Sequence, residues 1–335
     1  MTDDPIAATR WRVRADRARA WLDGPGKPVV SALRWLIVAG VLAFLAVRAG
    51  AIGWQTVLSS LPRDPWFYAA LAAAYLVLPA FETVVHGFLW RVNLARHAAV
   101  FVVKKVYNFG VLGYSGEAFL FAWARNRLGL SGERAFAVIK DNTILSAMVS
   151  NTATVALTAV LLLDQGLRPV VAGDPGALML AAASVGLCCV MLAGTLALRR
   201  MILSLAPADA LVVIGLHTVR LGLSLGLQAT VWAVALPSAP FEIWLLFLTV
   251  YMVLTRIPFL PNKDLLFIGV GVGLADVLPV APDEVARVLL VTGALTQGVN
   301  LAVFAAAAAA GWAAGGRRAD PPPAASDWAA SPQRG

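Results

Sequence analysis

The sequence predicts an all-α, polytopic helical membrane protein with about eight transmembrane helices and additional re-entrant or interfacial segments. Hydrophobic residues make up 59% of the 335-residue chain and charged residues only 14%, whereas charged residues are about 25% of a soluble domain. Several apolar stretches approach the ~20 residues that an α-helix needs to cross the hydrocarbon core of a bilayer. The connections between these stretches are short, which leaves no room for a sizeable soluble domain.

Three parts are expected along the chain. Residues 1–29 form a basic cytoplasmic arm, residues 30–312 a single transmembrane domain, and residues 313–335 a disordered tail. The first 35 residues hold seven basic side chains against four acidic ones, and this charged region is too long for the start of a signal peptide. The tail contains three consecutive prolines and has the composition of a disordered segment.

The apolar runs define the expected spans. Gly53–Leu61, after the first span, is short and amphipathic and is expected to lie in the interface. Val100–Tyr114 is apolar but contains Lys104 and Lys105, and each lysine at mid-membrane costs roughly 2.5–3.5 kcal/mol on insertion scales. This segment is therefore predicted to be re-entrant or half-buried, with protein or water around its backbone. The predicted spans are Val30–Val47, Trp66–Leu89, Thr143–Leu163, Ala177–Leu198, Leu211–Val234, Phe241–Ile257, Leu265–Val280 and Val285–Ala310.

The charge distribution predicts the orientation. With both termini in the cytoplasm, the basic clusters fall on the cytoplasmic side if Val100–Tyr114 does not cross and Leu265–Val280 does, as the positive-inside rule requires. Seven spans, with Leu265–Val280 re-entrant, is the alternative. The net charge of +8 lies beside the spans and favours anionic lipid headgroups over nucleic acid, because no basic groove with interleaved aromatic residues accompanies it. A bacterial inner membrane is the expected location.

The densest group of ionisable residues lies between Asn108 and Asp141. Gly116 precedes Glu117, and Arg125 follows two helical turns later. Glycine lets backbone N–H groups approach an anion closely, and arginine binds phosphate through two parallel hydrogen bonds. The stretch is therefore a candidate binding site for a charged or zwitterionic headgroup. The alternative is a cytoplasmic connector whose charges pair with one another in water.

Two polar pairs lie inside predicted spans. Glu82 and His86 are four residues apart, on one helix face. His217 and Arg220 are three residues apart and also share a face. Arg220 lies near mid-span, where an unpaired charge is costly, and it is expected to face a cavity or a carboxylate, with Glu82 or Glu117 as the candidates. Each pair is either part of a binding site or a structural contact between helices.

A late polar turn is the last candidate. Pro261, Asn262, Lys263 and Asp264 follow the sixth predicted span and could close a polar turn at the membrane edge. The alternative is that Asp264 caps the N-terminus of the next helix.

The central motif resembles a known family. The residues that carry the resemblance are Gly116-Glu117, Trp123-Ala124-Arg125, Leu128-Gly129-Leu130-Ser131, 135–139 and Asp141. They are similar to the signature segment of the lysylphosphatidylglycerol synthase transmembrane family, a flippase-like domain that also occurs without a synthase domain. Residues 119–121 stand where many members carry an arginine, and the late turn lacks the glycines of the family. The resemblance implies translocation of a phospholipid or lipid-linked headgroup, without aminoacyl transfer.

Enzyme chemistry has little support in the sequence. It contains no His-Glu-x-x-His motif, no glycine-rich phosphate loop ending in Lys-Ser/Thr and no Cys/His cluster with metal-ligand spacing. We therefore expect neither a metal nor a cofactor.

The leading hypothesis is a lipid flippase or headgroup translocator whose partners are anionic or lipid-linked membrane phospholipids. Re-entrant segments would bring backbone donors to mid-depth, as broken helices do in transporters. A membrane-embedded transferase, with Glu117 or Asp141 as the base, and a non-catalytic scaffold that binds envelope-biosynthesis proteins are the alternatives. The candidate substrate-binding residues are Glu82, His86, Asn108, Gly116, Glu117, Arg125, Asp141 and Arg220, with the late turn Pro261, Asn262, Lys263 and Asp264.

Overall fold

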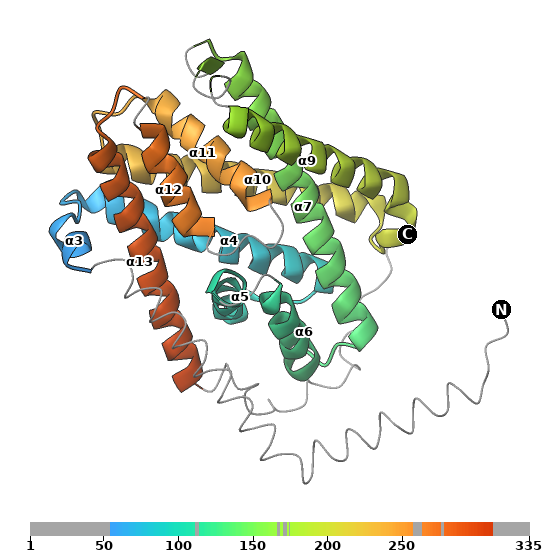
Figure 1. Cartoon of the computed structure of the whole chain (residues 1–335). Helices are drawn as coiled ribbons and strands as arrows, with labels where there is room; N and C mark the ends of the chain where they lie inside the picture. The colour runs from blue at the N-terminus through green and yellow to red at the C-terminus, as the bar shows by residue number, and fades with distance from the viewer. Residues whose placement is uncertain are drawn as a thin grey trace, which may run out of the picture.

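The computed structural model describes residues 54–110, 114–165, 168–169, 173, 175–256, 263–275 and 278–310. These residues form helices and connections without any strand, which confirms the predicted all-α class for this part of the chain (Figure 1). The helices are α3 (Trp54–Ser59), α4 (Pro65–Trp90), η1 (Ala95–His97), α5 (Ala98–Gly110), α6 (Ser115–Arg127), α7 (Gly132–Leu163), α9 (Pro175–Ile202), α10 (Pro207–Ala235), α11 (Phe241–Arg256), α12 (Lys263–Ala275) and α13 (Pro282–Ala309).

Five of these helices are long and apolar enough to cross a membrane, namely α4, α7, α9, α10 and α13. Helix α11 has 16 residues and α12 has 13, so at 1.5 Å per residue they extend about 24 Å and about 20 Å, less than a bilayer core of ~30 Å. The predicted number of eight spans is therefore not confirmed. The span expected at Val30–Val47, the basic arm and the C-terminal tail lie outside the described residues.

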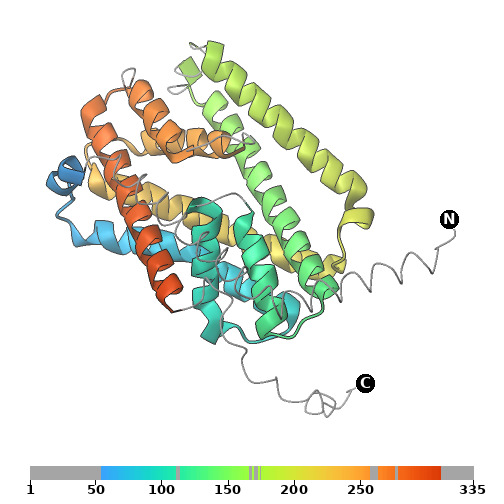
Figure 2. The same cartoon turned by 60° about the horizontal axis from the view of Figure 1, so that its bottom comes forward.

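Two long helices cross the middle of the bundle. Helices α4 and α10 lie side by side, and α7 and α13 run across them at a steep angle (Figures 1 and 2). The short helices α5 and α6 pack against each other in the space between α13 and α7. Helix α9 covers the outer side of α7. This arrangement encloses α5, the predicted re-entrant segment, among helices that are long enough to span a bilayer.

Helix α7 begins earlier than predicted. The predicted span begins at Thr143, and the structure has one continuous helix of 32 residues that starts at Gly132. The Ser131 side chain caps this helix by accepting a hydrogen bond from the Arg134 N–H at 3.2 Å. Gly129, with φ of 65°, adopts the left-handed conformation that turns the chain from α6 into this cap.

The segment Val100–Tyr114, predicted to be re-entrant or half-buried, is largely helical. Residues Ala98–Gly110 form one helix, α5. Its apolar residues Val100, Phe101 and Val106 are almost completely buried. A lysine inside such a helix is tolerated if a neighbouring helix supplies its counter-charge.

Close packing around Gly271 joins α11, α12 and α13. A Cβ atom at this position would lie 2.6 Å from Leu289 Cδ1 and 2.9 Å from Phe247 Cε1. The rings of Phe267 and Trp232 stack nearby, with centroids 5.7 Å apart. Gly271 lies in the segment Leu265–Val280, which the sequence predicted as a span or a re-entrant segment, and it provides a packing surface for the two neighbouring helices.

Helix α9 contributes little to the protein interior. Its buried residues are Ala181, Ser184 and Cys188, while Met179 and Val190 are more than two-thirds exposed. Monomeric soluble proteins rarely expose continuous apolar surface of this extent. The exposure is consistent with a helix whose outer face is covered by lipid.

Candidate functional site

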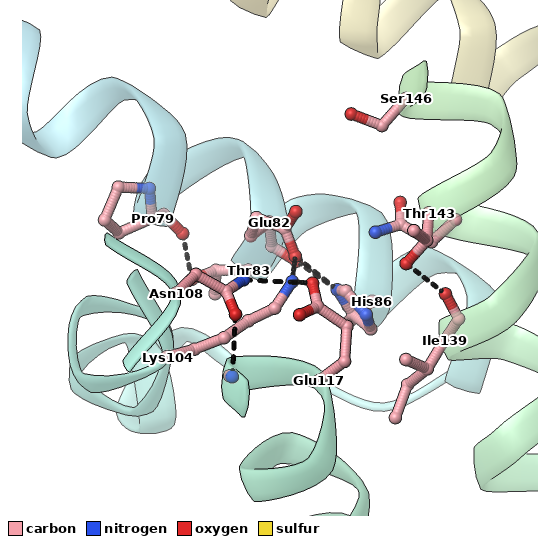
Figure 3. Close-up of polar contacts among 12 residues, drawn as sticks. Pro79, Glu82, Thr83, His86, Lys104, Asn108, Glu117, Ile139, Thr143 and Ser146 are labelled. Atoms are coloured by element: carbon pink, nitrogen blue, oxygen red, sulfur yellow. Dashed lines mark hydrogen bonds and ion pairs between the residues drawn. The ribbon is translucent and has the colours of Figure 1, made fainter. Parts of the chain in front are cut away.

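A buried ion-pair cluster joins three helices. Lys104 of α5 places its Nζ atom 2.6 Å from Glu82 Oε2 of α4 and 3.3 Å from Glu117 Oε1 of α6. Glu82 is 7% exposed and Lys104 4%. Figure 3 shows the two carboxylates converging on the ammonium group from opposite sides. The structure thus brings together two acids that the sequence singled out, through a lysine that it did not select for the site.

The position of Lys104 within an apolar segment could have identified it as a site residue from the sequence. An ammonium group inside an apolar helix requires a nearby carboxylate. Two carboxylates contact the Lys104 ammonium group, so the cluster of one cation and two carboxylates carries one net negative charge.

Asn108 and Gly116 hold the start of α6 against α5. Asn108 Nδ2 donates to Glu117 Oε1 at 3.1 Å, and the Gly116 N–H donates to Asn108 Oδ1 at 2.7 Å. A Cβ atom on residue 116 would overlap the Lys104 carbonyl oxygen and lie 2.7 Å from Asn108 Oδ1. Glycine is therefore required at this position, and it orients Glu117 toward Lys104.

His86 completes the cluster on α4. Its Nδ1 atom lies 2.9 Å from the Glu82 carbonyl oxygen and 3.3 Å from Glu82 Oε2. The imidazole packs against Trp90 and Phe101, with ring centroids 4.9 Å and 5.2 Å away. The ring is thus fixed by both polar and aromatic contacts.

Arg220 was expected to face a cavity or a carboxylate, and within the described residues it forms no ion pair with a carboxylate. Its Nη2 atom donates to Ser146 Oγ of α7 at 3.4 Å. Lys104, on a helix packed directly against α4 and α6, contacts Glu82 Oε2 and Glu117 Oε1 instead. One turn away on α10, His217 Nε2 lies 2.9 Å from Asn142 Oδ1 of α7.

Arg125 lies apart from the cluster. It is exposed in the last turn of α6 and stands over the Phe121 ring, 5.7 Å from the centroid. Glu117 lies in the first turn of the same helix, about 12 Å away along the axis. Arg125 and Glu117 therefore do not face one binding site, although their spacing of two turns puts them on similar sides of the helix.

Asp141 has a structural role in the observed arrangement. The side chain is 1% exposed. Its Oδ2 atom accepts a hydrogen bond from the Ser204 N–H at 2.8 Å, and Oδ1 lies 3.0 Å from Lys140 Nζ. Lys140 also donates to the Ile202 carbonyl oxygen. Together these contacts fasten the connection between α9 and α10 to α7.

We expect Asp141→Ala to lower the free energy of unfolding by about 1–2 kcal/mol, because it leaves the Ser204 N–H without its acceptor. The matched control is Asp209→Ala, which removes a partly exposed ion pair with Arg91 at 3.2 Å and is expected to cost less than about 1 kcal/mol. Denaturant unfolding in detergent micelles measures both. Equal losses in the two variants would contradict the anchoring role of Asp141.

Half of the late turn lies outside the described residues. The structure does not describe Pro261 and Asn262, and Lys263 and Asp264 are the first two residues of α12. The binding role expected for this turn stays a prediction.

Tyr75 links α4 to two other helices. Pro79 has no N–H, so the Tyr75 carbonyl oxygen one turn earlier lacks its helical donor, and Lys105 Nζ of α5 donates to it at 2.7 Å. The same ammonium lies 3.7 Å from the centre of the Tyr75 ring. The Tyr75 hydroxyl donates to Asn300 Oδ1 of α13 at 2.8 Å.

A pocket of about 180 Å³ lies between the ends of α4, α10 and α13, apart from the cluster. Ser60, Phe67, Leu236, Glu284 and Arg287 are among its lining residues, and the lining includes none of the cluster side chains. The lining also lacks Arg220, so this pocket is not the cavity that Arg220 was expected to face.

Several buried polar atoms near the cluster have no hydrogen-bond partner within the described part of the chain. They are Glu117 Oε2, His86 Nε2, Arg220 Nε and His217 Nδ1. Such atoms cost about 1–3 kcal/mol each when left unsatisfied, so they favour a polar ligand or water beside them.

The part of the chain that the structure describes contains no group of three or more His, Cys, Asp or Glu side chains that could hold a metal ion. Comparison of the chain with protein-family models, curated proteins and solved structures finds no match.

Proposed function

We propose that this protein moves a phospholipid or lipid-linked headgroup across a membrane, as its resemblance to the flippase-like family implies. In this proposal the membrane is a bacterial inner membrane and both termini lie in the cytoplasm, the orientation that the basic clusters of the sequence favour. The observation that carries the proposal is the Glu82–Lys104–Glu117 cluster, which is buried among helices that are apolar enough to span a bilayer. Ionisable groups in such surroundings are costly, and they commonly mark substrate or ion pathways.

The cluster offers a way to replace the hydration of a headgroup. The Lys104–Glu117 contact, at 3.3 Å, is longer than the Lys104–Glu82 contact, at 2.6 Å. The Glu117 side chain is also the more exposed acid, at 18% against 9%. In the proposed mechanism an anionic group of the lipid replaces Glu117 beside Lys104, while the acyl chains stay in the surrounding lipid. Glu117 is then free to accept a hydrogen bond from the same headgroup.

Reconstituted vesicles test this proposal. The purified chain is expected to accelerate exchange of a fluorescent phospholipid between leaflets, measured by quenching from outside. Glu117→Gln keeps the size of the side chain but removes its charge, and it is expected to slow exchange about tenfold, the effect of losing one charge-assisted hydrogen bond.

The matched control for Glu117→Gln is Asp283→Asn, because Asp283 is an exposed acid at the start of α13. Its exchange rate is expected to equal that of the wild type. Unaccelerated exchange by the wild-type chain would refute the proposal. A new lipid species detected by mass spectrometry would favour the transferase alternative instead.

A further inference from the structure

Two arginines approach α7 from neighbouring helices and contact neutral groups. Arg220 of α10 donates to Ser146 Oγ at 3.4 Å, and Arg256 of α11 donates to Asn151 Oδ1 at 3.1 Å. The two acceptors are five residues apart on α7, about 7.5 Å along the helix axis. Arg256 also contacts Thr255 Oγ1 of its own helix through Nε and Nη2, at 3.3 Å and 3.0 Å.

The two arginines lie equally many residues away from the connection between α10 and α11. Arg220 lies 15 residues before the end of α10 at Ala235, and Arg256 lies 15 residues after the start of α11 at Phe241. Each is therefore about 22 Å from the connection between the two helices. The helices pack against each other and against α7.

Neither guanidinium forms an ion pair with a carboxylate among the residues that the structure describes. There, the arginine–carboxylate pairs are those of Arg91 and Arg287. Arg220 is 8% exposed, and its Nε atom is buried without a hydrogen-bond partner. Arg256 is half-buried, so part of it is accessible from the surface. Like charges at this burial are unfavourable unless an anion lies between or beside them.

The summed charge of the two arginines and the ion-pair cluster indicates which charge a ligand of this region would carry. Glu82, Lys104 and Glu117 together carry one negative charge, and the two arginines carry two positive charges. The five groups therefore sum to one positive charge, which a phosphodiester with its single negative charge would neutralise. Guanidinium groups also match the geometry of phosphate oxygens, which they bind through paired hydrogen bonds.

We propose that Arg220 and Arg256 form a binding site for the phosphate group of a phosphodiester ligand, with Ser146 and Asn151 orienting the two guanidinium groups. The inference rests on the proposed function for the source of that phosphate, a lipid headgroup. It assigns to Arg256, which the sequence did not select, a direct contact with the ligand.

Ligand-induced stabilisation of the purified full-length chain in maltoside micelles tests the site. The probes are dihexanoyl phosphatidylglycerol, inorganic phosphate and, as the uncharged comparison, dihexanoylglycerol. Phosphatidylglycerol is expected to raise the thermal-unfolding midpoint, and dihexanoylglycerol is not. Arg256→Gln is expected to weaken the apparent affinity for phosphatidylglycerol about tenfold or more, because it removes a charged hydrogen-bond donor. Arg256→Lys should keep most of the affinity.

The variants also separate ligand binding from a structural role. Removing one of two repelling charges should leave the ligand-free midpoint of Arg256→Gln equal to or above that of the wild type. The exposed control Arg287→Gln should bind like the wild type. A lower ligand-free midpoint in Arg256→Gln together with an unchanged ligand response would overturn the proposal, and so would equal stabilisation by dihexanoylglycerol.

The probes also identify the source of the phosphate. A response to inorganic phosphate that Arg256→Gln abolishes supports the site and assigns it to free phosphate, whereas a response confined to phosphatidylglycerol assigns it to a headgroup. Binding in micelles requires no transport. Intact binding with no lipid exchange in vesicles would therefore remove the proposed function and leave the phosphate site standing.

Discussion

Replacing Lys104 by methionine is expected to lower the free energy of unfolding by about 3–5 kcal/mol, the usual cost of removing one partner from a buried ion pair. The Lys104 ammonium is the shared partner of Glu82 and Glu117. Methionine fills similar space without a charge, so two carboxylates would remain in an apolar interior without their cation. Denaturant unfolding in micelles, followed by tryptophan fluorescence, measures the change.

The neighbouring Lys105 supplies the control. Its ammonium contacts the Tyr75 carbonyl oxygen and ring, so Lys105→Met is expected to cost less, about 1 kcal/mol for one hydrogen bond. The double variant Lys104→Met with Glu82→Gln removes one stranded charge and should recover part of the loss, because the two sites are coupled. Equal losses in the two single lysine variants would show that packing, and not charge pairing, explains the effect.

Gly116→Ala is expected to destabilise the protein by about 3 kcal/mol, at the upper end for overpacking a well-packed site. The added methyl group would meet the Lys104 carbonyl oxygen, which is backbone, and Asn108 Oδ1. Helix α6 must then move away from α5, which breaks the Gly116–Asn108 hydrogen bond and shifts Glu117. Lipid exchange should fall together with stability, and both are measured on the same preparation.

An open glycine provides the comparison for Gly116→Ala. A methyl group added to Gly194 of α9 would meet no neighbouring atom within 4 Å, so Gly194→Ala should stabilise the helix by roughly 0.5–1 kcal/mol. Opposite signs for the two substitutions are the expected result. A neutral Gly116→Ala variant would contradict the close contact between α5 and α6.

The long helices could be predicted because their signal is local. The apolar run Trp66–Leu89 differs by one residue at each end from α4, which spans Pro65–Trp90. The start of α7 was missed because its first turns carry charged residues such as Glu133 and Lys140. Lys140 contacts Asp141, and Glu133 is exposed. The apolar pattern of one helix does not reveal such positions.

The site was predictable in part for the same reason. Glu82 and His86 were recognised because they lie one turn apart on one helix, and the structure places them 3.3 Å from each other. Lys104 and Arg256 were not selected, because their roles depend on partners in other helices. Arg125 was selected because it lies close to Glu117 in the sequence, but the two residues lie in the last and the first turn of α6.

Pro79 gives α4 a mechanically soft turn beside its buried acid. Where a regular helix would have a backbone hydrogen bond to the Tyr75 carbonyl, α4 has the ammonium of Lys105. A hinge at this turn therefore needs only a side-chain contact to lengthen, with no rupture of the backbone ladder. Glu82 follows the proline by three residues, so flexing of α4 would carry its carboxylate toward or away from α5. The stiffness of that hinge is set by a lysine on a different helix.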